Sequence, residues 1–149
     1  MTTPSTTRTT TTTAAKPRPK SVVWLATLAA AIALPVVLWV LVDPVGGHSL
    51  VAKTGDADVT VTLASVVFGA AVSTVMGLGV ASFLRRFAKG RTVWMILATV
   101  GTLMSLIVGP MSGSTATTVL VLVAMHLLVG GATLAGGLAL LGKRDVRDA

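Results

Sequence analysis

The longest run of the chain without a charged side chain, Thr92–Gly142, covers 51 residues and sets the strongest limit on the fold. An α-helix rises about 1.5 Å per residue, so about 20 residues cross a hydrocarbon core of about 30 Å. The run is therefore too long for a single membrane span. Gly109-Pro110 and the Ser and Gly residues that follow, as far as Ser114, are typical of a turn. The sequence predicts two spanning helices here, at about 92–108 and 116–141.

Two shorter uncharged runs, Ser21–Val42 and Val59–Leu84, are each long enough for one more span. They predict helices at about 21–42 and 60–84, joined by an outer loop over 43–59. Trp24 and Trp39 lie near the two ends of the first run, where indole rings favour the level of the lipid headgroups. The first run is longer than the about 7–15 apolar residues of a signal peptide, so we expect a permanent anchor. The expected fold is an all-α membrane protein, a four-helix transmembrane bundle.

The composition favours a membrane protein over a soluble one. Hydrophobic residues make up 53% of the chain and charged residues only 11%, whereas about 25% of the residues of a soluble domain are charged. An excess of 12 Lys and Arg over 5 Asp and Glu would suggest nucleic acid for a soluble protein. Here the cations lack interleaved aromatic residues and a recognition motif. We expect the lipid bilayer as a partner, and no nucleic acid.

The distribution of the 12 cations predicts the orientation in the membrane. All of them except Lys53 fall in three segments that share one side of a four-span protein, namely the tail before Ser21, the link 85–91 and the segment 143–149. By the positive-inside rule, both termini are expected in the cytoplasm of a bacterial cell, with the protein in its plasma membrane. Lys53 shares the other side with three acidic residues, Asp43, Asp56 and Asp58.

The remaining segments are predicted to form two tails and a hairpin. Residues 1–20 are rich in Thr and basic residues and lack an apolar period, which indicates a disordered cytoplasmic tail. Residues 143–149 are expected to form a second cytoplasmic tail. In the outer loop, Asp58–Thr62 alternates polar and apolar residues after a turn-like segment, which predicts a small extracellular β-hairpin. Because an isolated hairpin is marginal in water, we expect it to lean on the bundle.

Small residues recur along the predicted helices and indicate close packing. Lipid provides no hydrophobic drive between helices, so small side chains that let backbones approach are favoured at their interfaces. Contacts within the bundle are the favoured interpretation, and a homo-oligomer or a larger membrane complex is the alternative. The fourth helix also contains the pairs Gly130-Gly131 and Gly136-Gly137. The candidate packing residues are Gly69, Ser73, Gly77, Gly101, Ser105 and Gly130.

His126 is the one titratable side chain within the predicted spans, and it lies near the middle of the membrane. An ionisable residue at this depth is a functional candidate by default. In the first helix, Pro35 lacks an N–H group, which predicts a kink and frees the carbonyl of Ala31 at a similar depth. A hydrogen bond from His126 that ties two helices is favoured over a proton relay, because no carboxylate accompanies it. The hydroxyls at the same depth, which complete the predicted polar layer, are those of Ser73, Thr74, Thr99 and Thr102.

Few groups in the chain could support catalysis or metal binding. The chain contains no Cys, Glu or Tyr, which excludes disulfides, thiolate metal sites and many acid–base designs. The acidic residues and His48 of the outer loop match no standard metal spacing. We therefore expect no catalytic site, no cofactor and no metal. The basic cluster from Arg85 to Arg91 could bind anionic lipid headgroups, although membrane topology alone accounts for it.

The second half of the chain contains four short features: Arg85-Arg86, Arg91 followed by Trp94, Ser105 before Gly109-Pro110, and Met125-His126-Leu127. With these features the chain resembles an uncharacterised family of small four-helix membrane proteins from actinobacteria, over about 22–141. The resemblance implies the four-helix architecture and no assigned activity. The chain departs from the pattern at Gly130-Gly131, where larger aliphatic residues would be expected.

Two functions are the main candidates, and an enzyme that acts at the bilayer is the least favoured third. The favoured one is a non-enzymatic membrane component that packs against itself or a larger partner through its small-residue faces. The alternative is a small-solute or proton-linked transporter that uses His126. Small multidrug exporters have a similar size, but their embedded carboxylate has no counterpart between Val59 and Gly142. A water-accessible cavity that reaches His126 would favour transport, and a dry bundle would favour packing.

Overall fold

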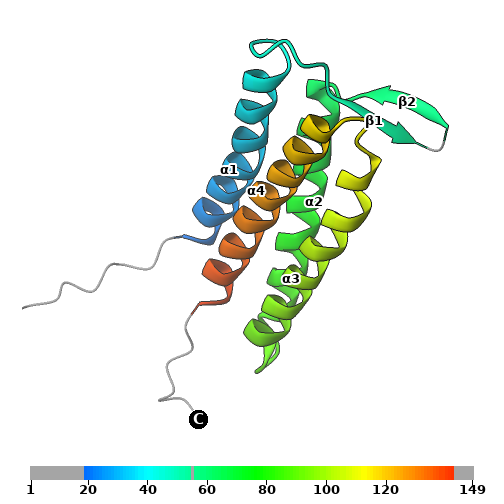
Figure 1. Cartoon of the computed structure of the whole chain (residues 1–149). Helices are drawn as coiled ribbons and strands as arrows, with labels where there is room; N and C mark the ends of the chain where they lie inside the picture. Colours follow the sequence, from blue (N-terminus) through cyan, green and yellow to red (C-terminus); the bar gives the residue numbers. More distant parts are fainter. Residues whose placement is uncertain (1–18, 55, 143–149) are drawn as a thin grey trace, which may run out of the picture.

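The computed structural model describes residues 19–54 and 56–142, which form four long helices and one hairpin (Figure 1). The helices are α1 (Lys20–Val42), α2 (Leu63–Leu84), α3 (Gly90–Val108) and α4 (Ala116–Leu141). The strands β1 (Val51–Thr54) and β2 (Ala57–Thr60) pair antiparallel, and a short 3-10 helix, η1 (Pro110–Ser112), separates α3 from α4. All four long helices are apolar enough to cross a membrane. The predicted all-α, four-helix membrane fold with a small hairpin is confirmed.

The two predicted tails lie outside the described residues, except for Pro19 and Lys20. Lys20 is the first residue of α1, one position earlier than the predicted start. The carbonyl of Pro19 accepts hydrogen bonds from the backbone N–H groups of Val22 and Val23, at 3.0 and 3.3 Å. The first turn of α1 therefore forms directly after the proline.

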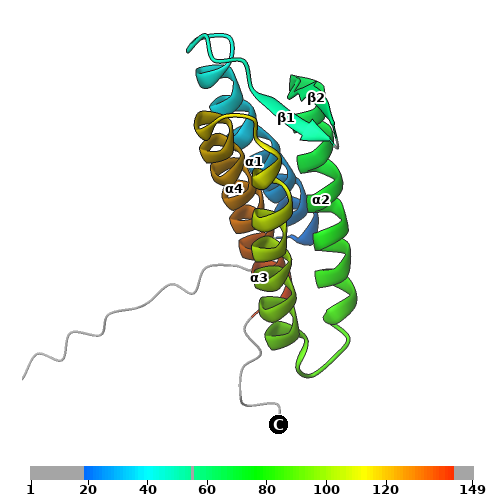
Figure 2. The same ribbon diagram turned by 45° about the vertical axis from the view of Figure 1, so that its right-hand side comes forward.

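The central element of the bundle is α4, which contacts each of the other three helices. Helix α1 packs along both α4 and α2, whereas α2 and α3 have much less contact with each other. The hairpin lies at one end of the bundle, and the start of α1, the α2–α3 link and the end of α4 lie at the other (Figure 1, Figure 2). Among the described residues, the carboxylates therefore lie at the hairpin end and the cations at the opposite end, except for Lys53 in the hairpin.

Helix α2 begins at Leu63 rather than near residue 60, because the preceding residues are used by the hairpin. Thr62 caps the helix, and its hydroxyl accepts a hydrogen bond from the backbone N–H of Ser65 at 3.3 Å. A hydroxyl in this position satisfies one of the N–H groups that a helix start leaves without a partner. Thr115 caps α4 in the same way, with a bond of 3.1 Å from the N–H of Thr118. Helix α3 begins at Gly90, two residues before the predicted start.

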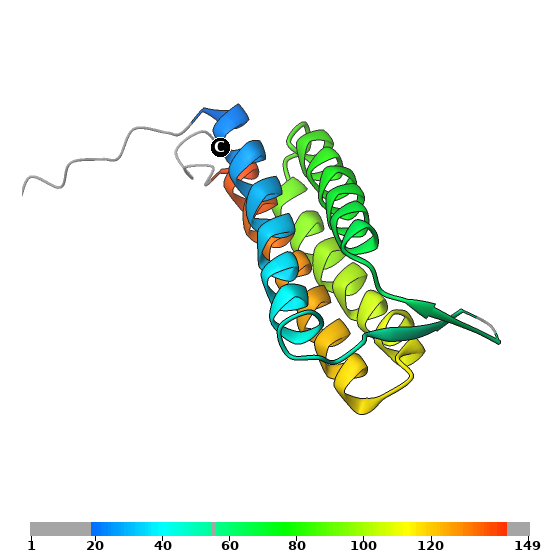
Figure 3. The ribbon, with the colours of Figure 1, turned by 90° about the horizontal axis from the view of Figure 1, so that it is seen from above.

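The hairpin is attached to the end of the bundle rather than free (Figure 3). Ala52 of β1 forms an antiparallel bridge with Gly113, and the carbonyl of Val51 accepts hydrogen bonds from the N–H and the hydroxyl of Ser114, at 3.0 and 2.9 Å. The indole N–H of Trp39 donates to the carbonyl of Val61 at 2.8 Å. These bonds connect the hairpin both to α1 and to the turn between α3 and α4.

Leu50 is the apolar anchor of the hairpin. Its side chain is completely buried and packs with Val121 and Met125 of α4, and Trp39 and Val61 surround this cluster. The N–H of Leu50 also donates to the carboxylate of Asp43 at 3.1 Å. An isolated hairpin would be marginal in water, so burial of this leucine adds to the bonds that hold the hairpin on the bundle.

Candidate functional site

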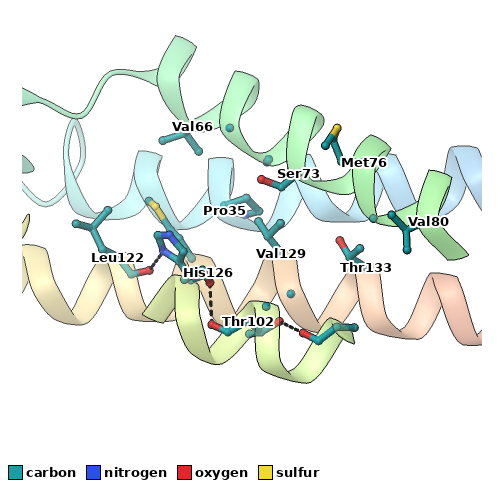
Figure 4. A pocket seen from close by; sticks show the side chains of 18 of the residues that line it. Pro35, Val66, Ser73, Met76, Val80, Thr102, Leu122, His126, Val129 and Thr133 are labelled. Carbon is teal, nitrogen blue, oxygen red and sulfur yellow. Dashed lines mark hydrogen bonds between the residues drawn. The ribbon is translucent and has the colours of Figure 1, made fainter. Parts of the chain in front are cut away.

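A cleft of about 620 Å³ lies between α2 and α3, and α4 forms its floor (Figure 4). We call it the α2/α3 cleft. Its α2 wall includes Gly69 and Ser73, its α3 wall includes Gly101 and Ser105, and His126 lies on the floor. Because Ser73 and Gly101 are exposed, the cleft opens at the side of the bundle. A guest would therefore enter from within the bilayer.

The lining of the α2/α3 cleft is mainly apolar. Pro35 of α1 also lines the cleft. The proline is buried, and α1 remains helical on both sides of it. A pocket of this size with a few convergent polar groups is typical of ligand sites, for which about 300–1,000 Å³ is usual. The polar side chains that line it are Ser65, Ser73, Thr102, Ser105, His126 and Thr133.

The candidate packing residues have two different surroundings. A side chain added at Gly77 would collide with Thr133, and one added at Gly130 would collide with Thr102, so these two glycines allow close helix contact inside the bundle. At Gly69 and Gly101, an added Cβ atom would meet no heavy atom within 4 Å. Ser73 and Ser105, like these two glycines, line the α2/α3 cleft. Gly69 and Gly101 are therefore not packed against another part of the described chain.

Glycines that the candidate set omits also make close contacts with neighbouring helices. Gly109 lies against the ring of His126, Gly136 against Thr27 and Gly137 against Trp94. The pair Gly136-Gly137 was visible in the sequence as a feature of the fourth helix. The residues that these two glycines contact, on α1 and α3, could not be predicted. A helical sequence pattern does not show which neighbouring helix a residue faces.

His126 faces the interior of the protein, but its hydrogen bond differs from the prediction. Its Nδ1 lies 2.7 Å from the carbonyl oxygen of Leu122, one turn earlier in α4 (Figure 4). Among the described residues, no hydrogen bond joins the ring to any of the four predicted hydroxyls. The carbonyl of Leu122 is thus the partner of Nδ1, and the Nε2 side of the ring packs on Gly109 at the end of α3. His126 thus joins two helices by packing rather than by an interhelical hydrogen bond.

The four predicted hydroxyls are not gathered in one layer. Thr74 is completely buried and its hydroxyl lies 3.3 Å from that of Thr133, which gives an interhelical bond between α2 and α4. Thr102 lines the cleft but donates to the carbonyl of Ala98 at 2.8 Å. Ser73 also lines the cleft, whereas Thr99 is exposed and is not part of its lining. Counting residues along each helix gave these side chains a common depth. It did not give the direction in which each side chain points around its helix axis.

The chemistry available in the α2/α3 cleft is limited to hydroxyls and one imidazole. Within residues 19–54 and 56–142, no group of three or more His, Asp or Glu side chains could hold a metal ion. The carboxylates in this part of the chain, Asp43, Asp56 and Asp58, belong to the hairpin end. The mainly apolar lining is suited to holding an apolar guest.

Comparisons with known proteins identify a family for the chain and give no activity. No curated protein and no solved structure matches the chain. One family model covers nearly the whole bundle, from a few residues before α1 to the last residue of α4. That model describes a family of unknown function, DUF6069, it matches residues 15–141, and the chain belongs to this family.

Proposed function

We propose that the protein is a non-enzymatic component of the bacterial plasma membrane that receives a transmembrane helix of another subunit in its α2/α3 cleft. Both termini would lie in the cytoplasm, with the hairpin on the outer side. The orientation is supported by the gathering of cations at the end opposite the hairpin. In this orientation, a partner within the membrane could contact the four helices and the cleft. A partner on the outer side could contact the hairpin.

The observation that carries this proposal is the open space at Gly69 and Gly101. These glycines lie on opposite walls of the cleft, and neither has a heavy atom within 4 Å of the position of a Cβ. A glycine inside a helix lowers helix stability by about 1 kcal/mol relative to alanine. In a membrane, small residues are favoured where a second helix backbone comes close. A helix seated between α2 and α3 would use both glycines.

The test is to fill the cleft without disturbing the bundle. Gly69→Leu and Gly101→Leu would each place a side chain in the cleft, and we expect them to weaken association about five- to hundredfold, in line with an overpacking cost of about 1–3 kcal/mol. Gly79→Leu is the matched control, because Gly79 is also exposed on α2 and open around its Cβ position but does not line the cleft. The control should leave association unchanged.

The partner is identified by cross-linking from within the cleft. The chain contains no Cys, so Ser73→Cys can carry a single thiol-linked benzophenone in native membranes. A product of twice the chain mass would indicate a second copy, and a product of another mass a different membrane protein. In either case Gly101→Leu should remove the product. Cross-links to lipid alone, or a product that survives Gly101→Leu and Gly69→Leu, would contradict the proposal.

A second candidate is a small-solute or proton-linked transporter, which is supported by the position of His126 on the floor of a cleft of about 620 Å³. The mainly apolar lining weighs against a hydrated path. If the protein transports a solute, His126→Ala should abolish uptake into proteoliposomes driven by a proton gradient. The ring bonds to its own helix, so the variant should keep the helical circular dichroism of the wild type. Under the first proposal, neither the wild type nor His126→Ala should show uptake driven by a proton gradient.

A further inference from the structure

We propose that the link between α2 and α3 forms a binding site for the headgroup of an anionic phospholipid. Four of the seven residues from Arg85 to Arg91 are cations. They occupy the end of the bundle opposite the hairpin, where the ends of α2 and α3 would reach the level of the headgroups. The site is separate from the α2/α3 cleft, and it does not depend on which leaflet this end faces. The cations are Arg85, Arg86, Lys89 and Arg91.

Backbone hydrogen bonds fold the link into a tight reversal, which brings the cations together. The N–H of Arg86 donates to the carbonyl of Phe83 at 3.2 Å, that of Phe87 to Leu84 at 3.0 Å and that of Gly90 to Phe87 at 3.1 Å. Gly90 is buried, and an added Cβ atom would overlap the carbonyl of Leu84. The glycine thus permits the close approach that places cations from both helix ends around one short turn.

An aromatic pair positions one of the cations. The guanidinium carbon of Arg86 lies 5.7 Å from the centre of the Phe83 ring, and the Phe83 and Phe87 rings meet edge to face with their centres 5.5 Å apart. Both rings are more than half exposed. Exposed phenyl rings at the end of a spanning helix contact lipid chains, while a guanidinium stacked on one of them keeps its N–H donors available for a phosphate. This combination favours a lipid over a free anion.

The positive charge of the link is not balanced by nearby carboxylates in the described part of the chain. The three Asp residues of residues 19–54 and 56–142 all lie at the hairpin end. Arg91 donates from Nη1 to the carbonyl of Gly142 at 3.0 Å, which leaves its charge unpaired with any of them. The segments attached at this end, 1–18 and 143–149, carry six cations and two Asp residues in their sequence. An anionic headgroup would therefore be attracted to this end.

The test uses the full chain reconstituted in phosphatidylcholine bilayers with a trace of spin-labelled phosphatidylglycerol or spin-labelled phosphatidylcholine. The immobilised fraction in the electron paramagnetic resonance spectrum gives the relative affinity for the two lipids. Wild type should prefer phosphatidylglycerol, and Arg85→Gln with Arg86→Gln should reduce the preference by about fivefold per cation removed. Lys53→Gln is the matched control, since it removes a cation from the hairpin end, and it should leave the preference unchanged.

Three results would overturn the site. They are equal immobilisation of the two lipids by wild type, a loss in Lys53→Gln as large as that in the double variant, and displacement of the labelled lipid by inorganic phosphate. The last result would indicate a site for a soluble anion. If the double variant fails to fold, Lys89→Gln, at an exposed position of the link, provides the test and should lower the preference by about fivefold.

Discussion

Replacing Leu50 with alanine is expected to lower the free energy of unfolding by about 2–5 kcal/mol, the range for truncating a fully buried leucine. The side chain is 0% exposed and fills the space between Val121 and Met125. Its removal would leave a cavity under the hairpin and weaken the contact that holds β1 and β2 on the bundle. The hairpin should then also become accessible to protease.

The measurement is the midpoint and slope of unfolding by sodium dodecyl sulfate in mixed micelles, followed by the circular dichroism of the helices. Val59→Ala is the control, since Val59 lies in β2 and is 48% exposed. It should change stability by much less than Leu50→Ala and leave the hairpin resistant to protease. Equal effects of the two variants would contradict the role of Leu50 as the anchor.

Gly137→Ala is expected to destabilise the bundle by about 1–3 kcal/mol, because the added methyl group would overlap the indole ring of Trp94. Trp94 is only 3% exposed and donates from its indole N–H to the carbonyl of Leu134 at 3.2 Å. A displacement of the ring away from the added methyl group would weaken this bond. Gly131→Ala, at an exposed position of the same helix with no heavy atom near the added Cβ, should be neutral or slightly stabilising.

A double-mutant cycle separates this contact from helix propensity. Trp94→Phe removes part of the ring that Gly137 faces, so the combined variant should cost less than the sum of Trp94→Phe and Gly137→Ala. Two results would contradict a close contact between Gly137 and Trp94. They are strictly additive stability changes for Trp94→Phe and Gly137→Ala, and a loss of stability in Gly131→Ala as large as that in Gly137→Ala. The same micelle titration provides all four values.

The helices and the hairpin could be predicted from the sequence because each depends on neighbouring residues. Uncharged runs of sufficient length gave the four spans, and Gly109-Pro110 placed the break between α3 and α4. The alternation from Asp58 onward gave the second strand. The start of the second helix was predicted at about residue 60 from the uncharged run, and α2 begins at Leu63. Apolar composition does not distinguish the end of a strand from the first turn of a helix, whereas the cap at Thr62 does.

The candidate site could be predicted only in part, because its geometry depends on the rotation and separation of helices. Three residues that were predicted to share one depth line the same cleft, namely Ser73, Thr102 and His126. Depth alone did not show that Thr74 bonds to Thr133 or that His126 bonds to Leu122. The cleft itself exists because α2 and α3 have limited contact with each other. No local sequence pattern indicates how closely two helices approach.

The predicted orientation, with the hairpin and the α2–α3 link on opposite sides of a bilayer, can be tested with single cysteines, since the chain has none of its own. Lys53→Cys places a thiol in β1 and Lys89→Cys places one in the link. In intact cells, a membrane-impermeant maleimide should label only Lys53→Cys, and Lys89→Cys should react only after the membrane is permeabilised. Labelling of both in intact cells, or of Lys89→Cys alone, would contradict the account.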